Sequence, residues 1–240
     1  MSKTENTENF PVASLFLTKD VRAQVLNFYK FARGADDIAD SPDLDIAEKY
    51  EQLKIDTTCQ FKEDLLCAFR QDVEKKRYET WDELMEYCRY SANPVGRFLL
   101  EIHHEEKGGD ESDALCSALQ TLNHLQDCKK DYLALDRIYL PAEFLKSGDS
   151  YEFFLSQAHM HPDLRLIFDR CLDKTDVLLK RALQLPSQIK NKRLRYQAKV
   201  TVLCGLALAG RLRREDPIAK RVELNTLDKL LLAYKGLYPL

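Results

Sequence analysis

The sequence predicts an all-helical protein, and three observations support this fold class. Apolar residues recur every three or four positions over long stretches, as at Val21, Val25, Phe28 and Phe31. Only eight glycines and eight prolines interrupt the 240 residues, and they cluster between the periodic stretches. Strand-like alternation is almost absent, and its best candidate, KVTVL at 199–203, continues into a helical pattern. No linker-like stretch divides the chain, so we expect residues 1–240 to form a single domain.

Four helices are expected before residue 107. The first carries the apolar spacing given above and ends at Ser41-Pro42, because a residue before proline disfavours helical backbone. The segment KGGDES at 107–112 ends the fourth, since paired glycines favour a break. These four helices are expected at 18–40, 43–54, 58–77 and 80–106.

Four further helices are expected after this break. The first of them has leucines at one-turn spacing and ends near the turn-like segment YLPAEF at 139–144. Pro186 is expected to separate the next two. The apolar run VTVLCGLALAG at 200–210 predicts a buried helix, because it is too short to span a bilayer. These helices are expected at 110–136, 150–184, 187–214 and 224–236.

Composition excludes several classes of protein. The 36 basic and 39 acidic residues give a formal net charge of −3, and no basic run of the kind that binds DNA is present, so no nucleic-acid partner is expected. Seven scattered cysteines without a CxxC pair, and a polar start without a secretory signal, favour a cytoplasmic protein with reduced thiols.

Peripheral contact of the protein with the inner face of the membrane stays open. The basic stretch KNKRLRYQAK at 190–199 is interpreted as a solvated helix face, with attraction to anionic headgroups as the alternative.

Three aspartates crowd into the segment FARGADDIAD at 31–40. On a helix, Asp36 and Asp40 lie one turn apart on the same face, and Asp37 lies about 100° around the axis. Like charges at this spacing repel, so the cluster costs stability unless a cation or water neutralises it. The first segment alone leaves both explanations open.

A second acidic segment, NHLQDCKKDYLALDRIYLP at 123–141, repeats the spacing with Asp127 and Asp131. If the two helices face each other, four or five carboxylates would form one site. Such hard oxygen donors suit Mg²⁺ or Mn²⁺, and Mg²⁺ commonly bridges carboxylates to phosphate oxygens. The residues therefore predict either a magnesium site for a phosphorylated substrate or two solvated acidic faces.

The surrounding motifs resemble the squalene/phytoene synthase family. They are the segment from NFPVAS to FYKFARGADDIAD at 9–40, YCRYSANPVGR at 87–97, ALQTLNHLQDCKKDYLALDRIYLP at 118–141, and RLRREDPIAKRVELNTLDKL at 211–230. The resemblance covers nearly the whole chain and looks closest to the HpnC-like branch, the hydroxysqualene synthases of bacterial hopanoid pathways. It implies an isoprenoid-synthase-type helical bundle in which two aspartate-rich helices flank a central apolar cavity.

The resemblance also implies roles for individual residues. The five aspartates Asp36, Asp37, Asp40, Asp127 and Asp131 match metal-binding positions. Positions that contact the diphosphate are matched by Arg33, Arg137 and Asn9. Asn9 lies with Phe10 in an N-terminal lid-like segment. Tyr87, Arg33, Tyr29, Gln120 and Asn123 match catalytic positions, and Val95 and Gly96 would leave room for a prenyl tail. Gln126 departs from the arginine of phytoene and squalene synthases, and the sequence does not explain its role beyond one positive charge fewer.

The implied function is Mg²⁺-dependent conversion of presqualene diphosphate to hydroxysqualene, with Mn²⁺ as a substitute metal and no NADPH expected. Ionisation of the diphosphate, rearrangement of the cation and capture by water would give the product. Head-to-head condensation of two farnesyl diphosphates is the alternative within the class. A non-catalytic relative that acts in assembly is the alternative outside it. The implied partners are a prenyl diphosphate and the pathway enzymes upstream and downstream.

Overall fold

The computed structural model describes residues 18–238, and these residues form an all-α bundle, as predicted. The only extended pairing among them is an isolated bridge between Arg77 and Ile138. No helix in this part of the chain combines the length and the apolar character needed to cross a bilayer. The α-helices are α1 Lys19–Asp40, α2 Ile46–Gln52, α3 Gln60–Glu74, α4 Trp81–Ser91, α5 Asn93–Ile102, α6 Gly109–Leu135, α7 Tyr151–Ser156, α8 Pro162–Ala182, α9 Leu185–Gln188, α10 Lys192–Leu212 and α11 Thr226–Lys235, with a short 3₁₀ turn η1 at Ala142–Phe144.

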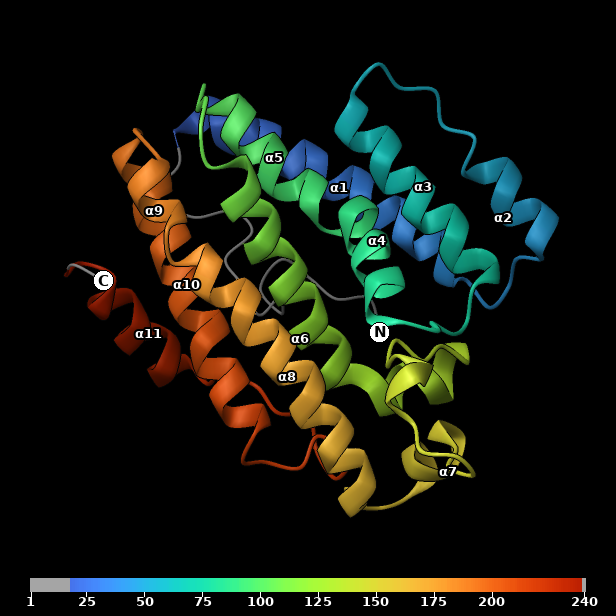
Figure 1. Cartoon of the computed structure of the whole chain (residues 1–240). Coiled ribbons are helices and arrows are strands. Elements are labelled where there is room, and N and C mark those ends of the chain that lie inside the picture. The colour runs from blue at the N-terminus through green and yellow to red at the C-terminus, as the bar shows by residue number, and fades with distance from the viewer. Residues whose placement is uncertain (1–17, 239–240) are drawn as a thin grey trace.

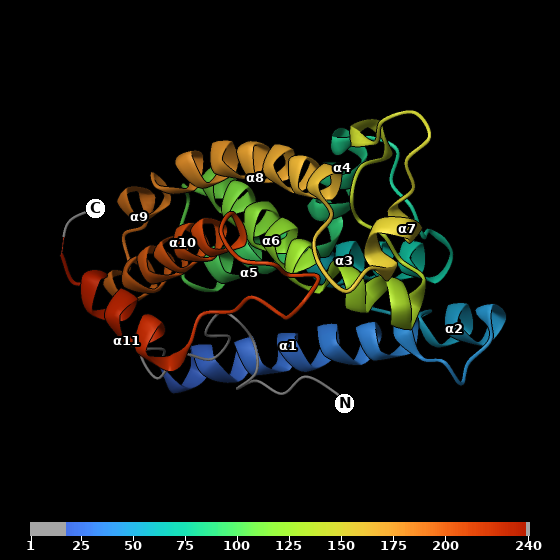
Figure 2. The same cartoon turned by 90° about the horizontal axis from the view of Figure 1, so that it is seen from below.

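Helix α6 forms the centre of the bundle (Figure 1). It packs against α4, α5, α7, α8 and α10, and its buried residues contribute to the largest apolar cluster, together with α8 and α10. Helix α1 lies along one side of the molecule, below α5 and α6 in the view of Figure 2. A second apolar cluster joins α1 to α3 through Phe28, Leu65 and Leu66, and Phe28 stacks on Phe98 of α5 at 4.2 Å between ring centroids. This packing fixes α1 in place opposite α6.

Two of the predicted helices are wrong as single elements. The helix expected at 80–106 divides into α4 and α5 at Ala92, whose φ of −126° and ψ of −46° are not helical. Pro94 lies in the first turn of α5, where its missing N–H costs nothing. The helix expected at 150–184 divides into α7 and α8, because His161 accepts a hydrogen bond from Asp163 as an N-cap and Pro162 opens the new helix.

The predicted break at Pro186 is also wrong in detail. Pro186 lies within the first turn of α9, and the chain leaves the helical conformation only at Ile189. Helix α10 then starts at Lys192, where Asn191 accepts hydrogen bonds from the backbone N–H groups of Arg193 and Leu194. The helix expected at 187–214 therefore becomes a short turn followed by a long helix.

Gly96 permits the close approach of α5 to α6. A Cβ at this position would overlap Ser112 Oγ and lie 2.7 Å from Cys116 Sγ, both on α6. Gly96→Ala is expected to lower the free energy of unfolding by about 1–3 kcal/mol, because the extra methyl overpacks this contact. Gly210→Ala is the control, since nothing lies near its Cβ and alanine favours a helix by up to about 1 kcal/mol. Urea denaturation of both variants measures the difference, and a Gly96→Ala variant as stable as wild type would contradict it.

Candidate functional site

Two adjoining cavities lie between α1 and α6. One is polar, with a volume of about 420 Å³, and the other is apolar, with a volume of about 340 Å³. Both are lined by Tyr29, Gln120 and Asn123, so these side chains stand where the cavities meet. The apolar cavity extends between α1, α5 and α10 and includes Val95 and Gly96 in its wall. The described residues thus contain the apolar cavity that was expected beside the two acidic helices.

The polar cavity brings together four of the five predicted metal-binding aspartates. Helix α1 contributes Asp36 and Asp40, and α6 contributes Asp127 and Asp131. Asp37 is not part of this lining, and its half-exposed side chain instead pairs with Arg33 at 2.7 Å. The two acidic segments therefore face one cavity from two helices, with Asp37 outside the lining.

Arginines neutralise part of this negative charge. Arg33 pairs with Asp36 at 2.7 Å, and Arg137 pairs with Asp40 at 2.6 Å. Arg221, from the segment between α10 and α11, holds both carboxylate oxygens of Asp127, at 2.7 and 3.2 Å. Arg221 was not among the predicted site residues. The contact joins residues 94 positions apart, and nothing in the local sequence around Arg221 indicates it.

Crowding changes the acidity of Asp36. Burial in the cavity, together with the charge of Asp40 one turn away, raises the pKa of Asp36 to about 7, although Arg33 opposes the shift. A group of this kind gains from a nearby cation, because positive charge relieves the repulsion between the two carboxylates. This repulsion is the loss of stability that the crowded aspartates of the segment 31–40 imply in the sequence.

Asp72 of α3 is a site residue that the sequence did not reveal. It lines the polar cavity with only 3% of its surface exposed, and it accepts a hydrogen bond from Tyr87 Oη at 2.8 Å. Tyr139 Oη donates to its other oxygen at 3.4 Å, and Arg137 Nη2 donates to its backbone carbonyl at 2.9 Å. Burial raises the pKa of Asp72 to about 6, with Arg137 and the Tyr87 hydroxyl acting in the opposite direction. Its position among the buried Ala68, Phe69 and Val73, on an apolar helix face, was the available signal.

Aromatic rings cover one wall of the polar cavity. The ring of Tyr87 lies 5.5 Å from that of Tyr78 and 5.6 Å from that of Tyr139. The His124 ring stacks on Tyr139 at 3.6 Å between centroids. Of these, Tyr87, Tyr139 and His124 line the cavity, and their ring faces can stabilise positive charge. Lys130 also lines this cavity and was not predicted.

Gln126, whose role the sequence left unexplained, lies away from the cavities. Gln126 lies outside both cavity linings, is 3% exposed, and donates through Nε2 to the carbonyl of Val222. Its side chain therefore ties α6 to the C-terminal segment that carries Arg221, and the expected effect of a lost charge beside the diphosphate has no support in this geometry. Asn9 and Phe10 lie outside the described residues.

The donor set suits a hard divalent cation only in part. Among residues 18–238, no three His, Cys, Asp or Glu side chains are grouped closely enough to hold a metal ion by themselves. The four cavity aspartates nevertheless offer oxygen donors from two sides of one cavity, which suits Mg²⁺ when a phosphate supplies further oxygens. The chemistry of the residues thus fits a metal bound together with an anionic ligand.

An all-α bundle with aspartates from two helices across a polar cavity, and an apolar cavity next to it, defines the isoprenoid-synthase class of helical folds. The model of the squalene/phytoene synthase family matches residues 4–61 and 57–228. The chain belongs to the squalene/phytoene synthase family and is an enzyme of isoprenoid synthesis.

Curated relatives point to one branch of this family. The hydroxysqualene synthase of Zymomonas mobilis is 38% identical over 97% of this chain and 88% of its own length. The hydroxysqualene synthase of Sinorhizobium fredii is 39% identical over 93% of this chain and 86% of its own length.

Solved structures agree with the fold. The squalene synthase HpnC of Alicyclobacillus acidocaldarius has a TM-score of 0.74 and 32% identity, with 88% of this chain and 90% of that chain covered. A dehydrosqualene synthase in complex with ligand has a TM-score of 0.80, covering 97% of this chain and 91% of that chain. At 21% identity, the second likeness supports the fold alone.

Proposed function

We propose that this enzyme converts presqualene diphosphate to hydroxysqualene with the help of Mg²⁺. The observation that carries the proposal is the polar cavity with aspartates on two sides, opening beside an apolar cavity. A substrate with a charged head and a long hydrocarbon body matches this division. The names of the relatives from Zymomonas and Sinorhizobium favour this member of the substrate class.

The diphosphate would lie in the polar cavity. Arg33 and Arg137 line it, and guanidinium groups pair well with phosphate oxygens. Asp36, Asp40, Asp127 and Asp131 would hold Mg²⁺, with Asp37 close to the first pair on α1. Bound there, the metal would neutralise the diphosphate and make it a better leaving group. The arginines that now pair with the aspartates would be released toward the substrate anion.

The two cavities have different roles in ionisation of the substrate and rearrangement of the cation. Breaking the C–O bond leaves the electron pair on the diphosphate and a cyclopropylcarbinyl cation on the hydrocarbon, next to the ring of Tyr87. The apolar cavity keeps this cation from bulk water while it rearranges. Water then adds its oxygen to the rearranged cation and gives up a proton to the released diphosphate, so the products are hydroxysqualene and hydrogen diphosphate. Gln120, Asn123 and Tyr29 line both cavities, and in this proposal the amide side chains of Gln120 and Asn123 would orient that water.

Product analysis tests this proposal. The purified protein would be incubated with Mg²⁺ and either presqualene diphosphate or farnesyl diphosphate, and the extracts analysed by gas chromatography and mass spectrometry. We expect hydroxysqualene in the incubation with presqualene diphosphate and no product in the incubation with farnesyl diphosphate. Turnover of farnesyl diphosphate would favour the condensing alternative, which the name of the Alicyclobacillus structure makes the second candidate.

Tyr87→Phe is expected to slow turnover of presqualene diphosphate by about 10- to 100-fold, because one hydrogen bond to a charged group is lost. The hydroxyl now donates to Asp72, and it can donate to the departing diphosphate when substrate fills the cavity. Tyr90→Phe on the same helix is the matched control and should leave kcat unchanged, since Tyr90 lines neither cavity. Steady-state kinetics of both variants check the effect. Equal rates for Tyr87→Phe and wild type would remove the hydroxyl from the mechanism.

A further inference from the structure

Helix α11 has apolar residues on two opposite faces. Its inner face packs on α10, where Leu232 is buried and Tyr196 Oη donates to the carbonyl of Ala233 at 2.8 Å. Gly236, just beyond the helix, lies against Val200 and Tyr196 of α10. These contacts hold α11 against the body of the protein, so its other face is presented outward at one end of the molecule (Figure 2).

The outward side chains form a continuous apolar stripe, here called the α11 outer face. They recur every three or four positions, as one face of a helix requires. Six of the thirteen large exposed apolar side chains in the described part of the chain fall between residues 227 and 238. A concentration of this kind marks a contact surface, whereas single exposed leucines do not. The α11 outer face consists of Leu227, Leu230, Leu231, Tyr234 and Tyr238.

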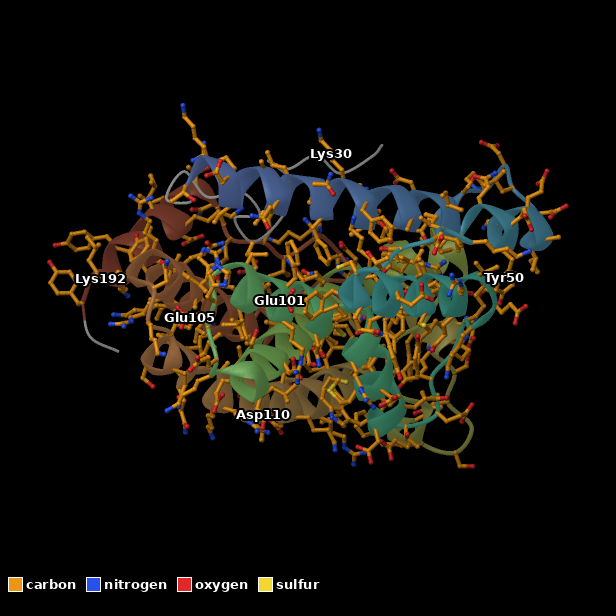
Figure 3. The ribbon with its side chains drawn as sticks, turned by 90° about the horizontal axis from the view of Figure 1, so that it is seen from above. Lys30, Tyr50, Glu101, Glu105, Asp110 and Lys192 are labelled. Carbon is orange, nitrogen blue, oxygen red and sulfur yellow. The ribbon has the colours of Figure 1, made fainter. Side chains whose placement is uncertain are left out.

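Positive side chains lie on α10 and α11 where these two helices meet. Lys192, Arg193 and Lys199 lie on the face of α10 that carries Tyr196, and Lys235 lies at the end of α11. None of these four forms an ion pair with an acidic residue in the described ranges, whereas the acidic neighbour Asp228 is paired with Arg211 at 2.7 Å. Figure 3 shows Lys192 at the end of the molecule where α10 begins. We call these four cations the basic rim.

We infer that the α11 outer face and the basic rim dock this enzyme on the surface of an anionic lipid bilayer. An apolar stripe flanked by lysine and arginine is the pattern of helices that lie in the membrane interface, and tyrosine suits the boundary between headgroup and acyl chain. A second copy of the chain fits this surface less well. In a symmetric pair the same surface would meet itself, so the four cations of the basic rim would gain no opposite charge there, as they would on an anionic bilayer.

Helix α10 lies between the proposed docking surface and the apolar cavity. Leu194 and Ala198 of α10 line the apolar cavity, and Tyr196 and Val200 on another side of the same helix contact α11. A bilayer against α11 would therefore lie one helix away from the cavity that receives hydrocarbon. This inference stands independently of the particular reaction proposed above.

Vesicle sedimentation of the full chain tests the inference. Vesicles of phosphatidylcholine mixed with phosphatidylglycerol should bind the protein, vesicles of phosphatidylcholine alone should bind it less, and added salt should weaken the binding. Leu230→Gln with Leu231→Gln should lower the partition coefficient by about tenfold for each leucine. Lys192→Glu with Arg193→Glu should abolish the preference for anionic vesicles.

Leu166→Gln with Val177→Gln is the matched control. These α8 side chains are 53% and 65% exposed, against 51% and 64% for Leu231 and Leu230, so the exposed fractions of the replaced apolar side chains are closely matched. The control should bind vesicles as wild type does.

Three outcomes would overturn the inference. One is failure of the wild-type chain to sediment with either vesicle. Another is equal loss of binding in the control pair. The third is a wild-type dimer in analytical ultracentrifugation that the Leu230 and Leu231 changes dissociate, because the face would then belong to a second copy. Turnover of presqualene diphosphate in detergent is measured separately, so loss of docking and failure of the proposed reaction are told apart.

Discussion

Asp36→Asn and Asp127→Asn should each lower turnover of presqualene diphosphate by at least about a thousandfold, because in the proposed mechanism these carboxylates hold Mg²⁺ on the diphosphate and a neutral amide cannot replace them. The two residues come from α1 and α6 and line the same cavity, so either change removes one side of the site. Product formation measured by gas chromatography and mass spectrometry, over a range of Mg²⁺ concentrations, gives the size of the effect.

The control for these variants is Asp43→Asn. Asp43 is exposed and lies just after α1, outside both cavity linings, so this change removes the same charge without touching the site. Circular dichroism should show that all three variants keep their helices. Normal activity of a folded Asp127→Asn variant would show that the second acidic segment does not serve the metal.

Arg137→Met should lower the free energy of unfolding by about 2–4 kcal/mol, because removing one partner of a buried ion pair leaves the other partner uncompensated. Arg137 is 4% exposed and bonds both Asp40 at 2.6 Å and the carbonyl of Asp72 at 2.9 Å. Because 33% of the Asp40 side chain is exposed to solvent, the expected loss of unfolding free energy is smaller than for a fully buried ion pair. Urea denaturation followed by circular dichroism provides the measurement.

Arg97→Met gives the comparison at the surface. Arg97 pairs with Asp113 at 2.6 Å but is half exposed, and its loss should cost less than about 1 kcal/mol. Asp40→Asn combined with Arg137→Met should cost less than the sum of the two single changes, since the pair is then removed together. Equal losses for Arg137→Met and Arg97→Met would refute the structural role assigned to Arg137.

Local patterns were enough to predict α1 and α6, the two longest helices among the described residues. The helix expected at 18–40 is α1, Lys19–Asp40, because apolar periodicity and the proline after Ser41 fix both its face and its end. The helix expected at 110–136 is α6, Gly109–Leu135, which ends at Asp136 in the left-handed conformation with φ of 51°. The division at Ala92 escaped prediction, because a proline in the first turn of a new helix and one inside a bent helix look alike in sequence.

Spacing alone predicted only those parts of the site that share a helix, and the family resemblance supplied others, such as Tyr87 and Arg137, which also line the polar cavity. The pairs on α1 and on α6 follow from four-residue spacing, and the structure places both at one cavity. The contact of Arg221 with Asp127 spans 94 residues, and that of Arg137 with the backbone of Asp72 spans 65. Contacts of this kind arise from the packing of whole helices, so no local spacing indicates them. Gln126 is the same case, because its hydrogen bond to Val222 depends on where the C-terminal segment lies.

The mass of the product formed in isotopically labelled water is the most direct test of the proposed reaction. Wild-type protein would be given presqualene diphosphate and Mg²⁺ in water enriched in heavy oxygen, and the extract analysed by mass spectrometry. We expect hydroxysqualene with the label in its hydroxyl group, because in the proposed reaction water captures the cation after the diphosphate has left. Unlabelled alcohol, or a hydrocarbon without oxygen as the sole product, would contradict it.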